Sequence, residues 1–291
     1  MTKRLINILI VACLIAILTA CSGNTSSSEL PVSLPFAKDD SSFSIQFIDV
    51  GQGDSALVCC DGYYMLVDGG DRNYGDRVYN TLQDGSVHKL DLLVMSHMHE
   101  DHIGGLPKAL TWAMTVKKTI APVEYYDSDD FIEIQHEVGT IDVPRKGEKY
   151  KLGSAEVEIL ENGTEQRSDN DSIVLLITYK KTKFLFTGDM EDRVETKLCD
   201  AFNDELPVDL LKVSHHGSQY ATSIRFLRML TDRSKKQYAV ISVGSNNVYG
   251  HPSEQTLSRL DQAEWKYFRT DRDGDITVES DGKKLTITSS K

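Results

Sequence analysis

Three histidines and one aspartate lie within six consecutive positions of this chain, in the segment Ser96–Ile103. The segment follows the apolar run 92–95, which is typical of a buried strand, and precedes the pair Gly104-Gly105. The end of a rigid strand is a favourable position for functional side chains, and glycines let other backbone approach closely. Because neutral imidazole and carboxylate groups bind zinc, manganese and iron, the segment predicts a metal site at the end of a buried strand.

Three further strand-like runs end in polar residues of the same kinds. They are Asp68 after the run 63–67, Asp189 after the run 184–187, and His215 with His216 after the run 208–213. One such end alone would be ordinary turn chemistry. Four of them, counting the histidine segment, predict a site that is assembled from several loops at one edge of a sheet.

The order of hydrophobic patterns is mixed, with strands and helices in both halves of the chain. We expect strands at 43–50, 55–60, 63–68, 91–96, 155–160, 172–179, 183–187, 208–213, 238–243, 265–269, 275–279 and 284–288, and helices at 75–84, 105–113, 190–202, 222–232 and 253–263. Two sheets covered by helices would account for this order. No repeat or linker divides residues 43–291, which we expect to form one domain.

The motif His-x-His-x-Asp-His at 97–102 resembles the hallmark of the metallo-β-lactamase fold superfamily. Within it, the chain is most similar to the metallo-β-lactamase-like domain of the competence protein ComEC and its secreted relatives. The residues that carry the resemblance are Phe47–Asp54, Ser96–Leu106, Phe184–Asp189, Leu211–Ser218, Ser242–Gly244, Tyr249–Pro252 and Arg269–Gly274. The resemblance implies an α+β fold, the four-layer αββα sandwich, and a metal-dependent hydrolase.

The resemblance also implies two divalent metal ions, zinc or manganese, and a role for each motif residue. His97 and His99 would bind the first ion, Asp101 and His102 the second, and Asp189 would bridge them. His215 is the expected remaining ligand of the second ion, with His216 as the alternative. Asp68 would orient the histidine loop, although it could equally be a turn residue.

The chain departs from the superfamily at the place where a third histidine for the first ion is common. The only histidine between the motif and Asp189 is His136, which we interpret as a surface residue. The expected place instead reads Ser168–Ser172, in which Asn170 or Asp171 could supply an oxygen. Such a site would tolerate manganese better than a site of three histidines.

Residues outside the ligand set have weaker signals. Asp101 and His251 are the predicted catalytic residues, and the resemblance places His251 toward the substrate, where it could contact a phosphate or donate a proton. The alternative for His251 is a loop residue before the helix that begins near Ser253. Asp54 lies in a glycine-rich hairpin and is interpreted as turn structure. Lys212 is one of five cations expected near the site, with Arg225, Arg228, Arg269 and Arg272; we interpret most of them as solvated charges, and a local phosphate site is the alternative.

The first residues have the pattern of a bacterial lipoprotein signal. Lys3 and Arg4 precede a short apolar stretch that ends in Leu18–Cys21, similar to a lipobox. We therefore expect a signal peptide at 1–20, a lipid on Cys21 that anchors the protein to the outside of the cell membrane, and a flexible Ser-, Asp- and Pro-rich tether at 21–42. The alternatives are a soluble protein cut near Ala20 or an uncleaved anchor.

The formal net charge of −12 argues against a broad basic surface for binding nucleic acid non-specifically. Three hypotheses for function remain. The first is a cell-surface phosphodiesterase whose substrate, by resemblance, is DNA. The second is a hydrolase of another phosphodiester or ester, for example phosphocholine esters of wall polymers. The third is a lipoprotein whose metal site only binds a ligand. The sequence indicates no protein partner.

Overall fold

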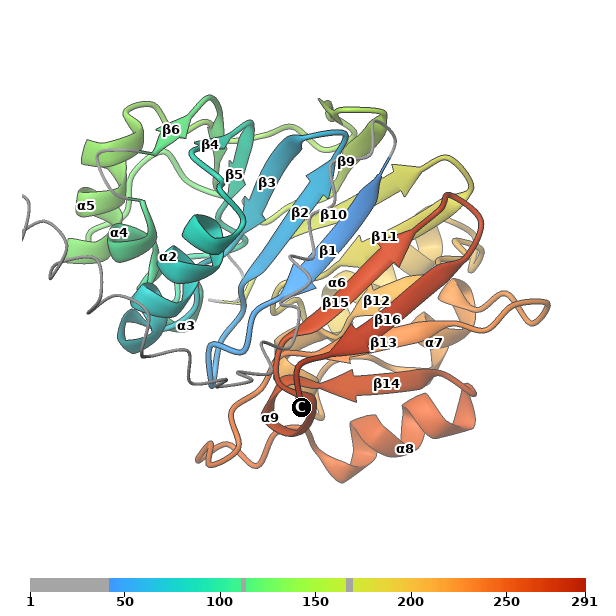
Figure 1. The fold of residues 1–291 in the computed structure, drawn as a ribbon. Coiled ribbons are helices and arrows are strands. Elements are labelled where there is room, and N and C mark those ends of the chain that lie inside the picture. The colour runs from blue at the N-terminus through green and yellow to red at the C-terminus, as the bar shows by residue number, and fades with distance from the viewer. Residues whose placement is uncertain (1–41, 111–113, 166–169) are drawn as a thin grey trace, which may run out of the picture. The chain divides into compact units, whose positions relative to one another are not determined.

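The computed structural model describes residues 42–110, 114–165 and 170–291, all within the compact unit Leu34–Lys291 (Figure 1). The expected signal peptide, Cys21 and nearly all of the expected tether lie outside the described residues and stay predictions. Among the residues described, no helix has both the length and the apolar character needed to cross a membrane.

The first of two seven-stranded sheets is built mainly from the N-terminal half. Its strand order is β16-β15-β1-β2-β3-β5-β7. The bounds are β1 (Phe43–Phe47), β2 (Ala56–Cys60), β3 (Tyr63–Val67), β5 (Leu92–Val94), β7 (Thr119–Ile120), β15 (Ile276–Ser280) and β16 (Leu285–Ser289). Two short strands, β4 (Lys89–Leu90) and β6 (Thr115–Val116), pair separately in parallel.

The second sheet follows in the chain and has the strand order β14-β13-β12-β11-β10-β9-β8. Its bounds are β8 (Lys149–Leu152), β9 (Ala155–Asn162), β10 (Ile173–Tyr179), β11 (Thr182–Phe186), β12 (Leu210–Lys212), β13 (Tyr238–Ile241) and β14 (Lys266–Arg269). Strands β11 to β14 are parallel, as are β3, β5 and β7 in the first sheet.

Helices cover the outer face of each sheet, as Figure 1 shows. The first sheet carries α2 (Gly75–Asp84), α3 (Glu100–Ile103), α4 (Leu106–Ala109) and α5 (Asp129–Val138). The second carries α6 (Asp192–Ala201), α7 (Ile224–Leu230) and α8 (Glu254–Gln262). Shorter turns of helix are η1 (Arg72–Tyr74), η2 (Ser214–Gly217) and α9 (Thr270–Asp273).

The core has three layers because side chains alternate along each strand. Phe43, Ile45 and Phe47 of β1 point into the space between the sheets, where Phe43 stacks on Phe184 with ring centroids 4.6 Å apart. Leu57 of β2 points to the opposite face and packs with α2. Each sheet therefore buries both faces, and the unit has a complete core of its own.

The parallel strands bring the functional loops to one edge of the sandwich. We call the edge that carries the loops after β3, β5, β11, β12 and β13 the site edge. The opposite edge, which carries the β10–β11 and β15–β16 turns and the starts of β1, β13 and β14, is the far edge.

The predicted fold class, an αββα sandwich, is confirmed by the two sheets and their covering helices. The sequence analysis did not identify α5, because Asp129–Val138 was considered only for its histidine. Ser128 begins α5 by accepting a hydrogen bond from Phe131 N, a capping signal that could have revealed it. The helix expected at 105–113 is α4 as far as it is described, and 111–113 lie outside the described residues.

Candidate metal centre

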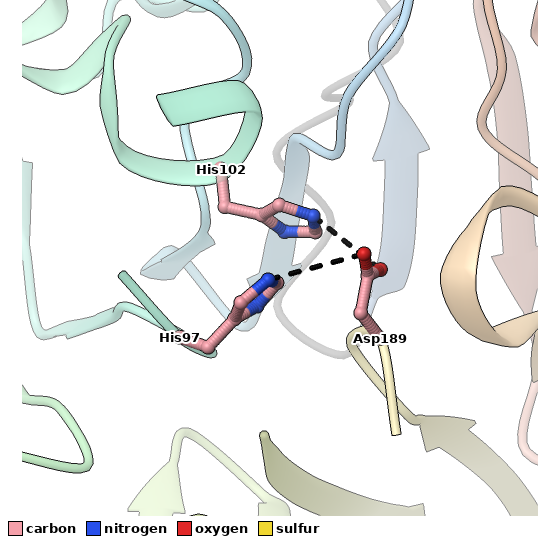
Figure 2. Close-up of side chains that lie close together, drawn as sticks. All are labelled: His97, His102 and Asp189. Carbon is pink, nitrogen blue, oxygen red and sulfur yellow. Dashed lines mark ion pairs between the residues drawn. The ribbon is translucent and has the colours of Figure 1, made fainter. Parts of the chain in front are cut away.

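Histidine and aspartate side chains from both sheets meet at the site edge. Figure 2 shows the rings of His97 and His102 turned toward the carboxylate of Asp189. His97 Nε2 lies 3.9 Å from Asp189 Oδ2, and His102 Nε2 lies 3.4 Å from Asp189 Oδ1. All three side chains are buried. The histidines follow β5 of the first sheet and the aspartate follows β11 of the second, so the cluster joins the two halves of the fold.

His216 and Asp101 form a second group around His102. His216 Nε2 lies 3.2 Å from Asp101 Oδ2 and 3.5 Å from Asp189 Oδ2. One ligand atom from each of Asp101, His102 and His216 falls within 4.8 Å of the others. Asp189 therefore lies between His97 and His216, within 4 Å of each.

The buried polar atoms of these groups fit a divalent metal ion. His102 Nε2, His216 Nε2 and Asp189 Oδ1 are buried and have no hydrogen-bond partner among the residues that the structure describes. Leaving a buried polar atom unpaired costs about 1–3 kcal/mol, and such atoms are normally satisfied. Imidazole nitrogens and carboxylate oxygens that converge in this way are the donor set of zinc and manganese.

Neighbouring groups orient both central imidazoles so that Nε2 faces the cluster. Asp68 Oδ2 accepts a hydrogen bond from His102 Nδ1 at 2.9 Å, and the carbonyl of Ser242 accepts one from His216 Nδ1 at 2.9 Å. Asp68 also accepts hydrogen bonds from Ser96 N and Ser96 Oγ, each at 2.7 Å. With the proton on Nδ1, each ring presents the Nε2 lone pair that a metal ion needs. Asp68 thus holds the histidine loop, as the resemblance implies.

The geometry favours His216 over His215 as the ligand in the loop after β12. The side chain of His216 is 2% exposed, whereas that of His215 is 21% exposed. His215 Nε2 lies 3.8 Å from Asp189 Oδ2, and His215 belongs to none of the ligand groups found among the described residues. Both residues have left-handed backbone, with φ of 49° and 52°. That costs free energy in a residue other than glycine and is typical of functional sites.

The remaining expected ligands lie near the cluster without completing a group among the residues described. His99 Nδ1 is 3.0 Å from His97 Nε2. The carboxylate of Asp171 pairs with Arg193, and the amide of Asn170 donates to Glu191 Oε1 at 2.9 Å. His136 is exposed on α5, which confirms its interpretation as a surface residue.

His251 lies beside the two histidines of the β12 loop. Its ring centroid is 5.5 Å from that of His215 and 6.4 Å from that of His216. Asn247 Oδ1 accepts a hydrogen bond from His251 N at 3.0 Å and fixes the loop. Burial and the neighbouring histidines lower the pKa of His251 to about 4. His251, the predicted substrate-facing residue, therefore lies next to the cluster.

The carboxylates and imidazoles shift each other's pKa values strongly. Burial opposes ionisation of Asp189, but His216 and His102 outweigh it and hold its pKa well below the usual range. Burial also opposes a positive charge on His102 and His216, yet Asp189 raises both pKa values well above the ordinary one. Burial and the nearby His102 lower the pKa of His97. The cluster therefore attracts positive charge, which a divalent cation would provide.

The sequence analysis misjudged two residues beside the cluster, Asp54 and Lys212. Both are buried, and Lys212 Nζ lies 2.5 Å from Asp54 Oδ2. Asp54 Oδ1 is also 3.4 Å from His216 Nδ1. Asp54 is therefore part of the buried network, whereas the sequence analysis assigned it to a turn. The signal that was overlooked is a lysine inside the otherwise apolar end of a predicted buried strand.

A hollow of about 470 Å³ opens beside His97 and His99. The loop between β7 and α5 lines its other wall with Tyr125, Tyr126 and Asp127. Tyr125 is 62% exposed and Tyr126 is 41% exposed. The hollow thus offers aromatic faces and a carboxylate to a substrate group that extends from the cluster.

Comparison with known proteins agrees with this geometry. Residues 48–239 match the family model described as "Metallo-beta-lactamase superfamily". ComE operon protein 3 of Bacillus subtilis is 27% identical over 80% of this chain and 32% of its own length. Competence protein ComA of Neisseria gonorrhoeae is 27% identical over 82% of this chain and 33% of its own. The chain therefore spans about a third of the length of these curated relatives.

The fold is also found among solved structures. The metallo-beta-lactamase fold protein YhfI from Bacillus subtilis has a TM-score of 0.55 and 14% identity, covering 82% of this chain and all of that chain. Identity at this level shows the fold alone. Because the family model matches more than half of the chain, this protein belongs to the metallo-beta-lactamase superfamily, as a metal-dependent hydrolase related to competence proteins.

Proposed function

We propose that this protein is a cell-surface phosphodiesterase that uses two divalent metal ions and acts on DNA. The observation that carries the proposal is the buried cluster of His97, His102, Asp189 and His216, whose ligand atoms converge from both sheets. When bound, zinc or manganese ions would lower the pKa of a shared water to give a nucleophile near neutral pH and would offset the charge of a phosphodiester.

The residues of the cluster and the histidines beside it have distinct roles in this proposal. His97 and His99 would hold one ion, while Asp101, His102 and His216 would hold the other. His216 replaces His215 in this assignment because its Nε2 is the closer to Asp101 and its ring is buried. Asp189 lies near ligands of both groups and would contribute its carboxylate to holding the ions. His215 and His251 lie at the exposed side, where they can contact a phosphate oxygen or the leaving group.

The similarity to proteins named for competence supports DNA as the substrate. A second substrate class has its own support in the hollow beside His97. Exposed faces of Tyr125 and Tyr126 next to Asp127 suit a quaternary ammonium group, which binds aromatic faces through cation–π attraction. Phosphocholine esters of wall polymers are therefore the alternative substrate.

The expected lipid on Cys21 would place the enzyme outside the cell membrane. The short apolar stretch and the lipobox-like end of the signal support this location. We expect the full chain to fractionate with membranes and Cys21→Ser to be released into the medium or periplasm. Release of both proteins to the same extent would contradict the lipid anchor.

The first test of the activity is hydrolysis of bis-p-nitrophenyl phosphate by the chain from Ser22 onward, loaded with manganese or zinc. We expect metal-dependent turnover that Asp101→Ala abolishes. Asp76→Ala is the matched control, because Asp76 is an exposed aspartate on α2 outside the cluster. DNA and phosphocholine esters are then compared as substrates. Bound metal without turnover of any phosphodiester would refute the proposal and favour a binding role.

A further inference from the structure

Lysines and arginines gather at the far edge of the sandwich. Lys180 and Lys181 form the β10–β11 turn, and Lys283 and Lys284 lie in the β15–β16 turn. The two turns touch, since Lys181 N donates to the carbonyl of Gly282 at 3.0 Å. Figure 1 shows the β15–β16 turn at the end of the sandwich where β1 begins. All four lysines are exposed.

A second set of cations continues the same edge along the starts of β13 and β14. Arg228, Arg233, Lys235 and Lys236 line a hollow of about 660 Å³, and Lys266 begins β14. We call these five residues, with the four turn lysines, the basic edge. In the part of the chain that the structure describes, Lys181, Arg233, Lys236, Lys283 and Lys284 have no carboxylate at ion-pair distance.

Acidic residues are fewer at this edge and are partly engaged. Asp209 and Asp232 pair with Lys235, while Asp281 accepts hydrogen bonds from the backbone of its own turn. Asp61 accepts from Ser154 N at 2.7 Å, and Glu264 lines the hollow. The nine cations of the basic edge outnumber these five carboxylates, although the whole chain has a net charge of −12.

The site edge has the opposite character. Its acidic residues include the cluster carboxylates and, around them, Asp49, Asp71, Asp271 and Asp275. Three of these four carboxylates are paired, Asp49 with Lys291, Asp271 with Arg269 and Asp275 with Arg77, so the acidic character of the site edge comes from the cluster carboxylates. Since fields at a surface are screened within about 8–10 Å at physiological salt, each edge presents its own sign of charge to a partner.

The first residues that the structure describes, Ser42 and Phe43, also lie at the far edge. The carbonyl of Ser42 accepts a hydrogen bond from Asp61 N at 3.0 Å, and Phe43 pairs with Cys60 and Ser280. Residues 21–41 therefore connect Cys21 to the basic edge. That length of chain reaches at most about 75 Å when extended, so a lipid on Cys21 would keep the start of the domain, at the far edge, within that distance of a membrane.

We propose that the basic edge docks on the anionic surface of the membrane and turns the metal centre outward. The proposal rests on the lipid anchor of the proposed function. Each lysine or arginine near an anionic surface strengthens binding by about fivefold, so several together give measurable attraction without the lipid. The cations beside the site edge, such as Arg77, Lys108, Arg272 and Lys291, are each paired with a carboxylate, so the orientation with the far edge toward the membrane is favoured over the reverse.

The test is co-sedimentation of the unlipidated chain from Ser22 onward with two kinds of vesicle. One kind is phosphatidylcholine alone, and in the other about a third is phosphatidylglycerol, which supplies the negative surface. The edge variant combines Lys181→Gln, Lys236→Gln, Lys283→Gln and Lys284→Gln. The matched control removes four cations beside the site edge, through Arg77→Gln, Lys108→Gln, Arg272→Gln and Lys291→Gln.

We expect the parent and control to bind anionic vesicles and the edge variant to bind at least tenfold more weakly, with unchanged thermal unfolding. Equal binding to both kinds of vesicle, or equal losses in both variants, would overturn the proposal. So would binding to soluble polyphosphate without binding to vesicles. The assay needs neither lipid on Cys21 nor turnover, so its failure is distinguishable from failure of the proposed function.

Discussion

Replacing Asp68 by asparagine should weaken metal binding, because the ring proton of His102 would move from Nδ1 to Nε2. In the native chain, the Asp68 carboxylate accepts from His102 Nδ1 at 2.9 Å and from Ser96 N and Oγ at 2.7 Å. An asparagine can keep the bond from Ser96 N, but its amide group then donates toward His102. The proton of the ring moves to Nε2, the atom that faces Asp189 at 3.4 Å, and the lone pair for the ion is lost.

The magnitude follows from these contacts. Disturbing a group that orients a metal-bound histidine typically costs 10- to 100-fold in metal affinity, and we expect a loss of about that size for Asp68→Asn. Asp68→Ala removes three hydrogen bonds to a buried carboxylate, at about 1.5 kcal/mol each, and should lower the free energy of unfolding by about 4.5 kcal/mol.

The assay is a competition titration with a chromophoric zinc chelator, combined with urea unfolding of the metal-free chain. Asp209→Asn is the control, since Asp209 is also a buried aspartate that accepts a backbone hydrogen bond, from Lys183 N at 2.9 Å, but lies at the far edge. The control should lose stability and keep its metal affinity. Zinc affinity of Asp68→Asn within about twofold of the parent would refute the tautomer argument.

Other parts of the structure give three further predictions. His216→Ala should lower the amount of bound metal, measured by elemental analysis, more than His215→Ala, because only His216 belongs to a ligand group; equal losses would contradict this assignment. Lys212→Met should cost about 3–5 kcal/mol in urea unfolding by removing the lysine partner of the buried Asp54 carboxylate, and a loss below about 1 kcal/mol would argue against a buried ion pair. Burial raises the pKa of Glu195, so the folded chain binds this proton more tightly than the unfolded chain. The stability contributed by this group is complete below its ordinary pKa and falls as the pH rises toward the raised value; Glu195→Gln should flatten that part of the pH profile of unfolding.

The alternation and length of apolar runs predicted most of the fold. Strand β10 was expected at 172–179 and lies at Ile173–Tyr179, and α2 was expected at the residues where it lies. These elements bury wide apolar faces, so apolar residues recur along their sequence at the period of a strand or a helix. Strand β8 was not expected, because Lys149–Leu152 buries only its last residue and pairs at a sheet edge.

The candidate site was predictable where its chemistry is local and not where it depends on distant partners. The histidine motif at 97–102 carries its ligand types within one short segment. Asp54 follows a glycine turn and gives no local sign of burial, since its partner Lys212 comes from the other sheet. The choice between His215 and His216 depends on two left-handed backbone positions, which no side-chain pattern reveals.

The division of the cluster between the two sheets links catalysis to the cohesion of the fold. His97 and His102 belong to the first sheet, whereas Asp189 and His216 belong to the second. An ion held by both groups would add a cross-link between the two halves, which also adhere through side-chain packing, the ion pair of Lys212 with Asp54 and backbone hydrogen bonds such as that from Ile173 N to the carbonyl of Ser96. Binding free energy then adds to the energy that keeps the sheets together, and a chelator loosens the whole sandwich as well as its active edge. The metal would be a structural element of this enzyme as much as a reagent.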